Sequence, residues 1–169
     1  MAGFAAPGER RLLLVRHGAA GAAPMGGSDR DRPLSPVGRQ GVEDLAGYLR
    51  QHAMTADHGL CSPARRTRET MEILTENQNP IDTDWSEELY LASAGTLLSA
   101  LRNVPRRSAT VLLVGHNPGL QELVIALAGK AAPPASGGFP PATLAAFAVA
   151  APWSELGPGS TRLTLFRTP

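Results

Sequence analysis

The chain has 169 residues, of which 43% are hydrophobic and 18% are charged, and its formal net charge is +1 at neutral pH. This balance is typical of a globular protein and gives no overall field that would attract nucleic acid or a membrane surface. The length predicts a single domain over residues 11–169, preceded by a flexible tail over residues 1–10.

Cysteine content and hydropathy bear on the compartment. Cys61 is the only cysteine, so the chain forms no internal disulfide and no cysteine-rich zinc site. No stretch approaches the ~20 apolar residues of a membrane span. The residues before Arg11 also lack the apolar core of a signal peptide. We therefore expect a cytoplasmic protein.

Short apolar runs alternate with segments of helical periodicity along the chain. The first half predicts a strand at 12–16, a loop at 18–32, a helix at 35–51, a strand at 59–61, a helix at 62–76 and a strand at 81–85. The second half predicts a helix at 93–102, a strand at 110–114, a helix at 117–129, a loop at 131–141 and strands at 143–149 and 162–166. Ser35, Ser62 and Asn117 each precede a proline and are predicted to cap a helix. The alternation predicts an α/β fold, a three-layer α/β/α sandwich with a mostly parallel central sheet.

Two of the predicted strands end on a histidine. Arg-His-Gly at 16–18 follows the apolar run 12–15, and Gly-His-Asn-Pro at 115–118 follows the run 111–114. Ligands gather at the carboxyl ends of strands in open α/β sheets, so His17 and His116 are expected to share a site. A neutral imidazole is a good nucleophile, and a phosphorylated histidine splits one difficult displacement into two easier ones. The pattern favours one histidine as nucleophile and the other as an electrostatic or proton-handling partner.

An arginine-rich segment opens the second predicted helix. Arg65, Arg66 and Arg68 stand near a helix N-terminus, which already favours anions. Neighbouring residues of a helix point about 100° apart, so at most one of Arg65 and Arg66 faces a given site. Taken alone, the segment is more typical of a solvated basic helix face than of a binding site.

Together these motifs resemble the histidine phosphatase superfamily, whose fold is phosphoglycerate mutase-like, and within it the small phosphohistidine phosphatases of the SixA type. The resemblance rests on residues 14–18, on 32–35 with Gly38, on Ser62-Pro63 with Arg66 and Thr70, on 113–119, and on 139–140 and 163–166 near the end. It implies an enzyme that needs no metal and no cofactor. It also implies that His17 is the nucleophile and that Arg16, Arg66 and His116 complete the phosphate pocket.

The chain departs from the superfamily pattern at the acid that protonates the leaving group in many members. Ala19 and Ala20 follow the first motif here, which leaves Glu87 and Asp31 as candidate acids, with Asp29 beside them. An imidazole leaves more easily than an alkoxide, because its conjugate acid has a pKa near ~6.5. The sequence therefore predicts a phosphatase that acts on phosphohistidine presented by a partner protein.

Three alternatives remain open at this point. The chain could be a phosphatase for a small phosphomonoester, or a non-catalytic domain that binds phosphate or a partner. A cysteine phosphatase would need an arginine after five spacers. With five spacers after Cys61, the position that would need arginine is Thr67, and Arg66 comes one residue too early. Cys61 is therefore expected to be a buried strand residue.

Overall fold

The computed structural model describes residues 9–133 and 138–169. Its strands are β1 (Arg10–Arg16), β2 (His58–Cys61), β3 (Asp82–Trp85), β4 (Thr110–Gly115), β5 (Leu144–Val149) and β6 (Thr161–Arg167). Its α-helices are α1 (Pro36–Gln51), α2 (Arg65–Thr75), α3 (Ala94–Arg102) and α4 (Gly119–Ala128). Within these two ranges, no helix is both long and apolar enough to cross a membrane.

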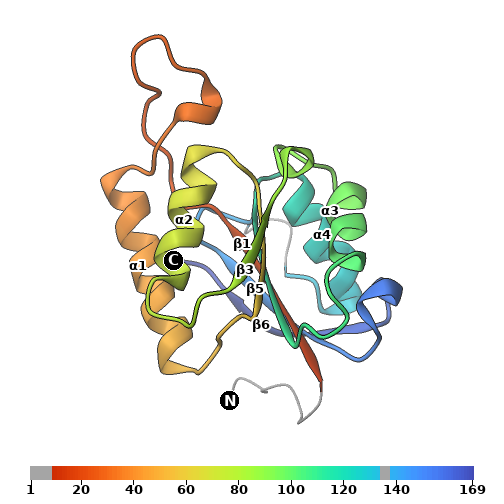
Figure 1. Cartoon of the computed structure of the whole chain (residues 1–169). Helices are drawn as coiled ribbons and strands as arrows, with labels where there is room; N and C mark the ends of the chain where they lie inside the picture. Colours follow the sequence, from red (N-terminus) through yellow and green to blue (C-terminus); the bar gives the residue numbers. More distant parts are fainter. Residues whose placement is uncertain (1–8, 134–137) are drawn as a thin grey trace.

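The strands form one sheet in the order β3-β2-β4-β1-β5-β6. The first four are parallel to one another, while β5 is antiparallel to β1 and β6 is antiparallel to β5. Helices α1 and α2 cover one face and α3 and α4 the other (Figure 1). The predicted three-layer fold is therefore confirmed. Strand β1 begins at Arg10, inside the expected tail, and residues 1–8 of that tail lie outside the described residues.

The central strand β1 is apolar on both sides because helices cover both faces of the sheet. Leu12 and Leu14 pack into the cluster that includes α3 and α4, whereas Leu13 and Val15 pack into the cluster beneath α1 and α2. All four side chains have no exposed surface. Each buried side chain of this size contributes about 1.5–3 kcal/mol. The packed strand thus fixes the position of the residue that follows it, His17.

The register of the parallel strands decides which side chains meet at the carboxyl edge. Arg16 of β1 lies opposite Gly115 of β4, so His17 and His116 leave neighbouring strands at the same level. A main-chain hydrogen bond continues this alignment past the strand ends, since the His17 N–H donates to the Gly115 carbonyl at 3.2 Å. Strand β2 borders β4 on its other side and ends at the same edge.

The two predicted serine caps have different outcomes. Ser35 caps α1 as predicted, since its hydroxyl accepts a hydrogen bond from the Gly38 N–H at 3.0 Å. The prediction for Ser62 is wrong: α2 begins at Arg65, and the Ser62 hydroxyl lies 2.8 Å from His116 instead. The Ser-Pro pair after β2 therefore belongs to a turn at the sheet edge.

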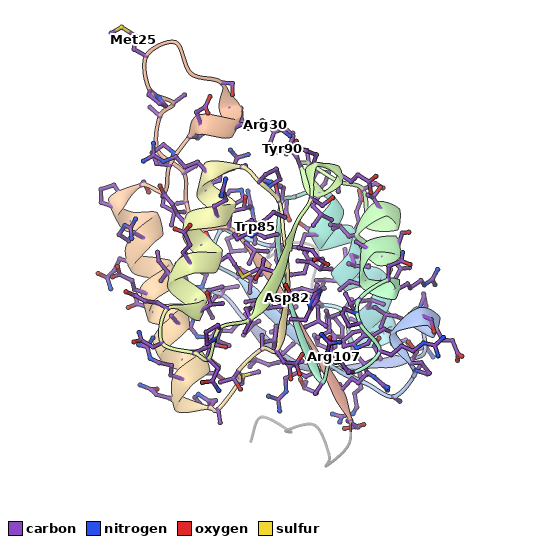
Figure 2. The ribbon with its side chains drawn as sticks, in the orientation of Figure 1. Met25, Arg30, Asp82, Trp85, Tyr90 and Arg107 are labelled. Atoms are coloured by element: carbon purple, nitrogen blue, oxygen red, sulfur yellow. The ribbon has the colours of Figure 1, made fainter. Side chains whose placement is uncertain are left out.

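The segment between β1 and α1 projects from the carboxyl edge of the sheet (Figure 1). It is a loop, as predicted, with a short 3-10 turn at Asp29–Asp31. A bridge between Ala20 and Leu34 closes its base. Met25 lies at its tip and is fully exposed (Figure 2). The 3-10 turn returns toward the ends of the strands, where it contributes side chains to the site.

Candidate active site

A cavity of about 470 Å³ opens where β1 and β4 end. It brings together the four residues that the sequence predicted for the phosphate site. Its lining comprises Arg16, His17, Ala19, Ala20, Asp29, Arg32, Arg66, Leu91, His116, Asn117 and Pro141.

His17 is buried at the end of β1, with only 8% of its surface exposed. Its Nδ1 lies 2.7 Å from the Gly18 carbonyl oxygen, an acceptor, so Nδ1 carries the proton and donates it. The Nε2 atom then holds the lone pair and accepts a hydrogen bond from Nε of Arg66 at 3.3 Å. Burial, with the nearby cations Arg66 and Arg16, lowers the pKa of His17 to about 4. The ring is therefore neutral at neutral pH, and Nε2 is the nitrogen that carries its lone pair.

The glycine of the first motif permits close packing. A Cβ atom at Gly18 would lie 2.7 Å from both the Gly38 carbonyl oxygen and Cγ2 of Val42, on α1. The Gly18 N–H donates to the Thr70 hydroxyl of α2 at 3.1 Å. The chain after His17 is thus fixed against both helices of this face.

Arg66 lies in the first turn of α2 and is 4% exposed, whereas the side chain of Arg65 is 54% exposed and pairs with Glu69. Arg66 is thus the one of the two that faces the cavity. Its Nη2 lies 3.4 Å from Nδ1 of His116. Arg66 also donates two hydrogen bonds to Asp29, from Nη1 to the carbonyl oxygen at 2.6 Å and from Nη2 to Oδ2 at 2.9 Å.

His116 is 2% exposed, and its ring centroid lies 5.1 Å from that of His17. Burial, with His17 and Arg66 close by, lowers its pKa to about 3, so the ring is neutral at neutral pH. Because Arg66 donates toward Nδ1, the proton sits on Nε2, which donates to the Ser62 hydroxyl at 2.8 Å. A bound phosphoryl dianion would favour a second proton on this ring.

Arg16 supplies a second guanidinium to the cavity. Its Nη1 donates to the Phe139 carbonyl oxygen at 2.8 Å, which also accepts from Nδ2 of Asn117 at 3.1 Å. The Nε atom of Arg16 is buried and has no hydrogen-bond partner among the described residues. A buried donor without an acceptor is costly. This unpaired donor fits a wall that binds an anion.

Asp29 brings a carboxylate to the same cavity. Its Oδ2 accepts from the Tyr90 hydroxyl at 2.7 Å and from Arg66 at 2.9 Å, and its Oδ1 accepts from Arg32 at 3.2 Å. These hydrogen bonds, first that of Tyr90, lower the pKa of the Asp29 carboxyl to about 2. Asp29 is therefore ionised at neutral pH.

The two foremost candidate acids of the sequence lie elsewhere. The carboxylate of Asp31 accepts from the Ser28 N–H at 2.7 Å and from its hydroxyl at 2.8 Å. Glu87 pairs with Arg30, whose guanidinium lies 4.3 Å from the centre of the Tyr90 ring (Figure 2). Neither carboxylate is among the described residues that line the cavity. The structure does not bring them to the histidines.

Cys61 lies inside the sheet with no exposed surface, as predicted. Its thiol contacts the carbonyl oxygens of Ser62 at 3.3 Å and Thr67 at 3.4 Å. Burial raises the pKa of this thiol, which disfavours the thiolate that a cysteine phosphatase needs.

The sequence model of the histidine phosphatase superfamily (branch 1) matches residues 12–97, which is more than half of the chain. The chain belongs to the histidine phosphatase superfamily. An uncharacterized protein of Mycobacterium tuberculosis is 34% identical over 161 residues, with 92% of this chain and 99% of that protein covered. The predicted family resemblance is therefore confirmed.

Two solved structures of histidine phosphatases resemble this chain throughout. One is described as a proposed phosphohistidine phosphatase SixA from Nakamurella multipartitia, with a TM-score of 0.83, 31% identity, and coverage of 96% of this chain and 97% of that one. The other carries the same description and comes from Agrobacterium tumefaciens, with a TM-score of 0.82, 30% identity, and coverage of 95% and 98%. The chain is thus a phosphatase with the phosphoglycerate mutase-like fold of these neighbours.

Two residues of this histidine phosphatase site were not predicted. The Ser-Pro pattern predicts a helix cap at Ser62, although its place directly after β2, at the edge that also carries His116, indicates a residue of the site. Tyr90 is 61 residues from Asp29 in the sequence, and no local pattern connects the two. Only the packing of the projecting loop against the segment after β3 brings them together.

Proposed function

We propose that this phosphatase removes phosphate from phosphohistidine on a partner protein, through a phosphohistidine intermediate on His17. The observation that carries the proposal is the pairing of a neutral nucleophile with an ionised carboxylate in one cavity. The two neighbours described as proposed SixA phosphatases, each at least 30% identical, support the same substrate class.

In the first step, the lone pair on Nε2 of His17 attacks phosphorus. The bond from phosphorus to the substrate nitrogen breaks and its electron pair stays on that nitrogen, while the other ring nitrogen of the substrate already carries a proton, so the ring leaves as neutral imidazole. The Nδ1 proton of His17 remains in its hydrogen bond to the Gly18 carbonyl and stabilises the phosphorylated imidazolium. Arg16 and Arg66 would hold the phosphoryl oxygens, since this reaction depends mainly on positioning and charge stabilisation.

In the second step, water attacks the phosphorus of phosphorylated His17. The bond from phosphorus to Nε2 breaks, the electron pair returns to Nε2, and both protons of the water leave with the phosphate as dihydrogen phosphate. His116 would donate to a phosphoryl oxygen in both steps once the dianion has raised its proton affinity. The enzyme returns to its starting state with a neutral His17.

The state of Asp29 favours phosphohistidine over a phosphomonoester. An alkoxide leaving group needs a proton from a general acid. A carboxyl group with a pKa of about 2 holds no proton to give at neutral pH. An imidazole leaving group departs without that help, because it is a far weaker base.

The single thiol of the chain fits the reducing cytoplasm, which we propose as the compartment.

The test measures phosphate release by chelator-treated protein from two substrates. One is a synthetic histidine peptide phosphorylated with phosphoramidate, and the other is para-nitrophenyl phosphate. We expect the phosphopeptide to be strongly preferred. We also expect His17→Ala to lower turnover by at least ~10³-fold. His52→Ala is the matched control, since His52 lies just past the C-terminal end of α1 and stacks on Tyr48.

Three outcomes would contradict the proposal. Equal or better turnover of para-nitrophenyl phosphate would favour the small-molecule phosphatase. Phosphate binding without turnover of either substrate would favour a non-catalytic domain. Retained turnover in His17→Ala would remove the nucleophile from the proposal. In the wild type, brief incubation with labelled phosphopeptide should also leave an acid-labile, base-stable label that His17→Ala lacks.

A further inference from the structure

A carboxylate at a phosphate site requires an explanation. Asp29 is the one carboxylate among the described residues that line the cavity, which also holds Arg16, Arg32 and Arg66. An ionised carboxylate repels a phosphoryl dianion, so its presence weakens the binding of phosphate itself. Its place in the cavity is therefore better explained by another part of the substrate.

The guanidinium of Arg66 contacts both the proposed nucleophile, His17, and the carboxylate of Asp29. Its Nε lies 3.3 Å from Nε2 of His17, and its Nη2 lies 2.9 Å from Oδ2 of Asp29. The nucleophile and the carboxylate thus contact two different nitrogens of one guanidinium. The attacking and leaving atoms of a transferred phosphoryl group stand roughly in line. With a phosphoryl group bound at Arg66, His17 would stand at the Nε atom of the guanidinium and Asp29 at its Nη2 atom, in the same cavity as the leaving group.

Asp29 is also accessible and able to accept a further hydrogen bond. Its side chain is 48% exposed. An ionised carboxylate has about four acceptor positions, and Tyr90, Arg66 and Arg32 use three of them. Oδ1 of Asn117 is another acceptor at the cavity, but it belongs to an uncharged amide, so only Asp29 offers a negative charge to a cationic leaving group.

We propose that Asp29 is a specificity-determining residue that accepts a hydrogen bond from the protonated ring nitrogen of the leaving phosphohistidine. This inference rests on the proposed function. The reactive form of the leaving ring carries phosphorus on one nitrogen and a proton on the other, so it is a cation. When the phosphorus–nitrogen bond breaks, the electron pair stays on the first nitrogen and the proton stays on the second. The ring departs as neutral imidazole, and Asp29 remains ionised throughout.

The same carboxylate discriminates against phosphomonoesters. An ester oxygen carries no proton and no positive charge, so Asp29 offers it repulsion and no hydrogen bond. One residue thus attracts the intended leaving group and disfavours the alternative one. Tyr90 and Arg32 hold Asp29 in place while Arg66 engages the phosphoryl oxygens.

The experiment compares Asp29→Asn with Asp31→Asn, which removes the same charge two residues away and outside the cavity lining. The probes are the phosphorylated histidine peptide, para-nitrophenyl phosphate and inorganic phosphate. For Asp29→Asn we expect kcat/KM for the peptide to fall by about 10-fold or more, the effect of losing a charge-assisted hydrogen bond. We expect kcat/KM for para-nitrophenyl phosphate to rise and inorganic phosphate to bind more tightly. Asp31→Asn should keep the wild-type ratio between the two substrates.

Two results would overturn this inference, and they are distinguishable. If Asp29→Asn lowers turnover of both substrates by the same factor, Asp29 only positions Arg66 and the proposed function stands. If the wild-type protein does not hydrolyse the phosphopeptide, the proposed function fails and this inference fails with it.

Discussion

The Oγ atom of Ser62 lies 2.8 Å from Nε2 of His116, and the two residues leave neighbouring strands of the sheet. A hydroxyl can donate as well as accept a hydrogen bond. In the structure the Ser62 hydroxyl accepts from Nε2, because Arg66 donates to Nδ1. When a phosphoryl oxygen requires a donor at Nδ1, the same hydroxyl can accept from the imidazolium or donate to Nε2. Ser62 therefore orients His116 in both states.

Replacing Ser62 by alanine should lower kcat for the phosphopeptide by about 10-fold, the effect of losing one hydrogen bond to a group that becomes charged. KM should change less, since Arg16 and Arg66 remain. Steady-state kinetics at saturating substrate measure this effect.

Ser93→Ala is the matched control. Ser93 caps α3 by accepting from the Thr96 N–H at 3.2 Å and does not line the cavity. Its loss should lower the free energy of unfolding by ~1 kcal/mol and leave kcat as in the wild type. An equal loss of kcat in both serine variants would contradict the role of Ser62.

Removing the hydroxyl of Tyr90 should raise the pKa of Asp29. The Tyr90 hydrogen bond is the first cause of the low value of about 2, against an ordinary 3.8. Tyr90→Phe keeps the ring beneath Arg30 and removes only the donor to the carboxylate. Carbon NMR titration of the Asp29 carboxyl group should therefore place the midpoint of Tyr90→Phe above that of the wild type.

Glu87→Gln serves as the control for this titration, because it unpairs Arg30 but leaves the Tyr90 hydroxyl in place. Its midpoint should stay closer to that of the wild type. A midpoint unaltered by Tyr90→Phe would mean that Arg66 and Arg32 alone hold the carboxylate ionised.

The two buried histidines should make the fold sensitive to mild acid. Their pKa values are about 4 for His17 and about 3 for His116, both lowered by burial from 6.5. As the pH falls below 6.5, these histidines bind protons in the unfolded chain but stay neutral in the folded protein. The free energy of unfolding therefore falls. For His17 the loss is ~3 kcal/mol by about pH 4. Asp29 adds to it only below its ordinary pKa of 3.8.

Urea unfolding at about pH 7 and about pH 4.5 measures this loss. His17→Asn should show a smaller difference between the two conditions, because it removes one of the two groups. The control is His52→Asn, just past the C-terminal end of α1, which should show the same difference between the two conditions as the wild type. The same pH dependence in wild type and His17→Asn would contradict the assignment.

Two glycines of α1 should respond oppositely to alanine. A Cβ atom at Gly38 would lie 1.9 Å from the Ala19 carbonyl oxygen, whereas one at Gly41 would lie 3.7 Å from Cβ of Ala142. Gly38→Ala should therefore lower the free energy of unfolding by ~3 kcal/mol or more. Gly41→Ala should raise it by about 0.5–1 kcal/mol, because alanine favours the helix. Thermal unfolding of the two variants tests the pair, and a Gly38→Ala protein as stable as the wild type would contradict the close approach.

Much of the architecture was readable from local patterns. The apolar runs at 12–15 and 111–114 can only be buried strands or helix segments, and their short length favours strands. The histidines that follow them could be assigned to one edge because parallel strands end together. The choice of Arg66 over Arg65 came from the family resemblance, and the exposure of the two side chains agrees with it.

The sequence by itself determined the layers of the fold and the neighbourhood of His17, Arg66 and His116, because periodicity and strand ends are local properties of the chain. Only the tertiary structure decided which nitrogen of His17 is free, since that depends on hydrogen bonds to Gly18 and Arg66. It also decided that Asp29, not Asp31 or Glu87, enters the cavity. Those three carboxylates look alike in sequence. The distant partner Tyr90 and the path of the projecting loop separate them, and both are set by packing between segments far apart in the chain.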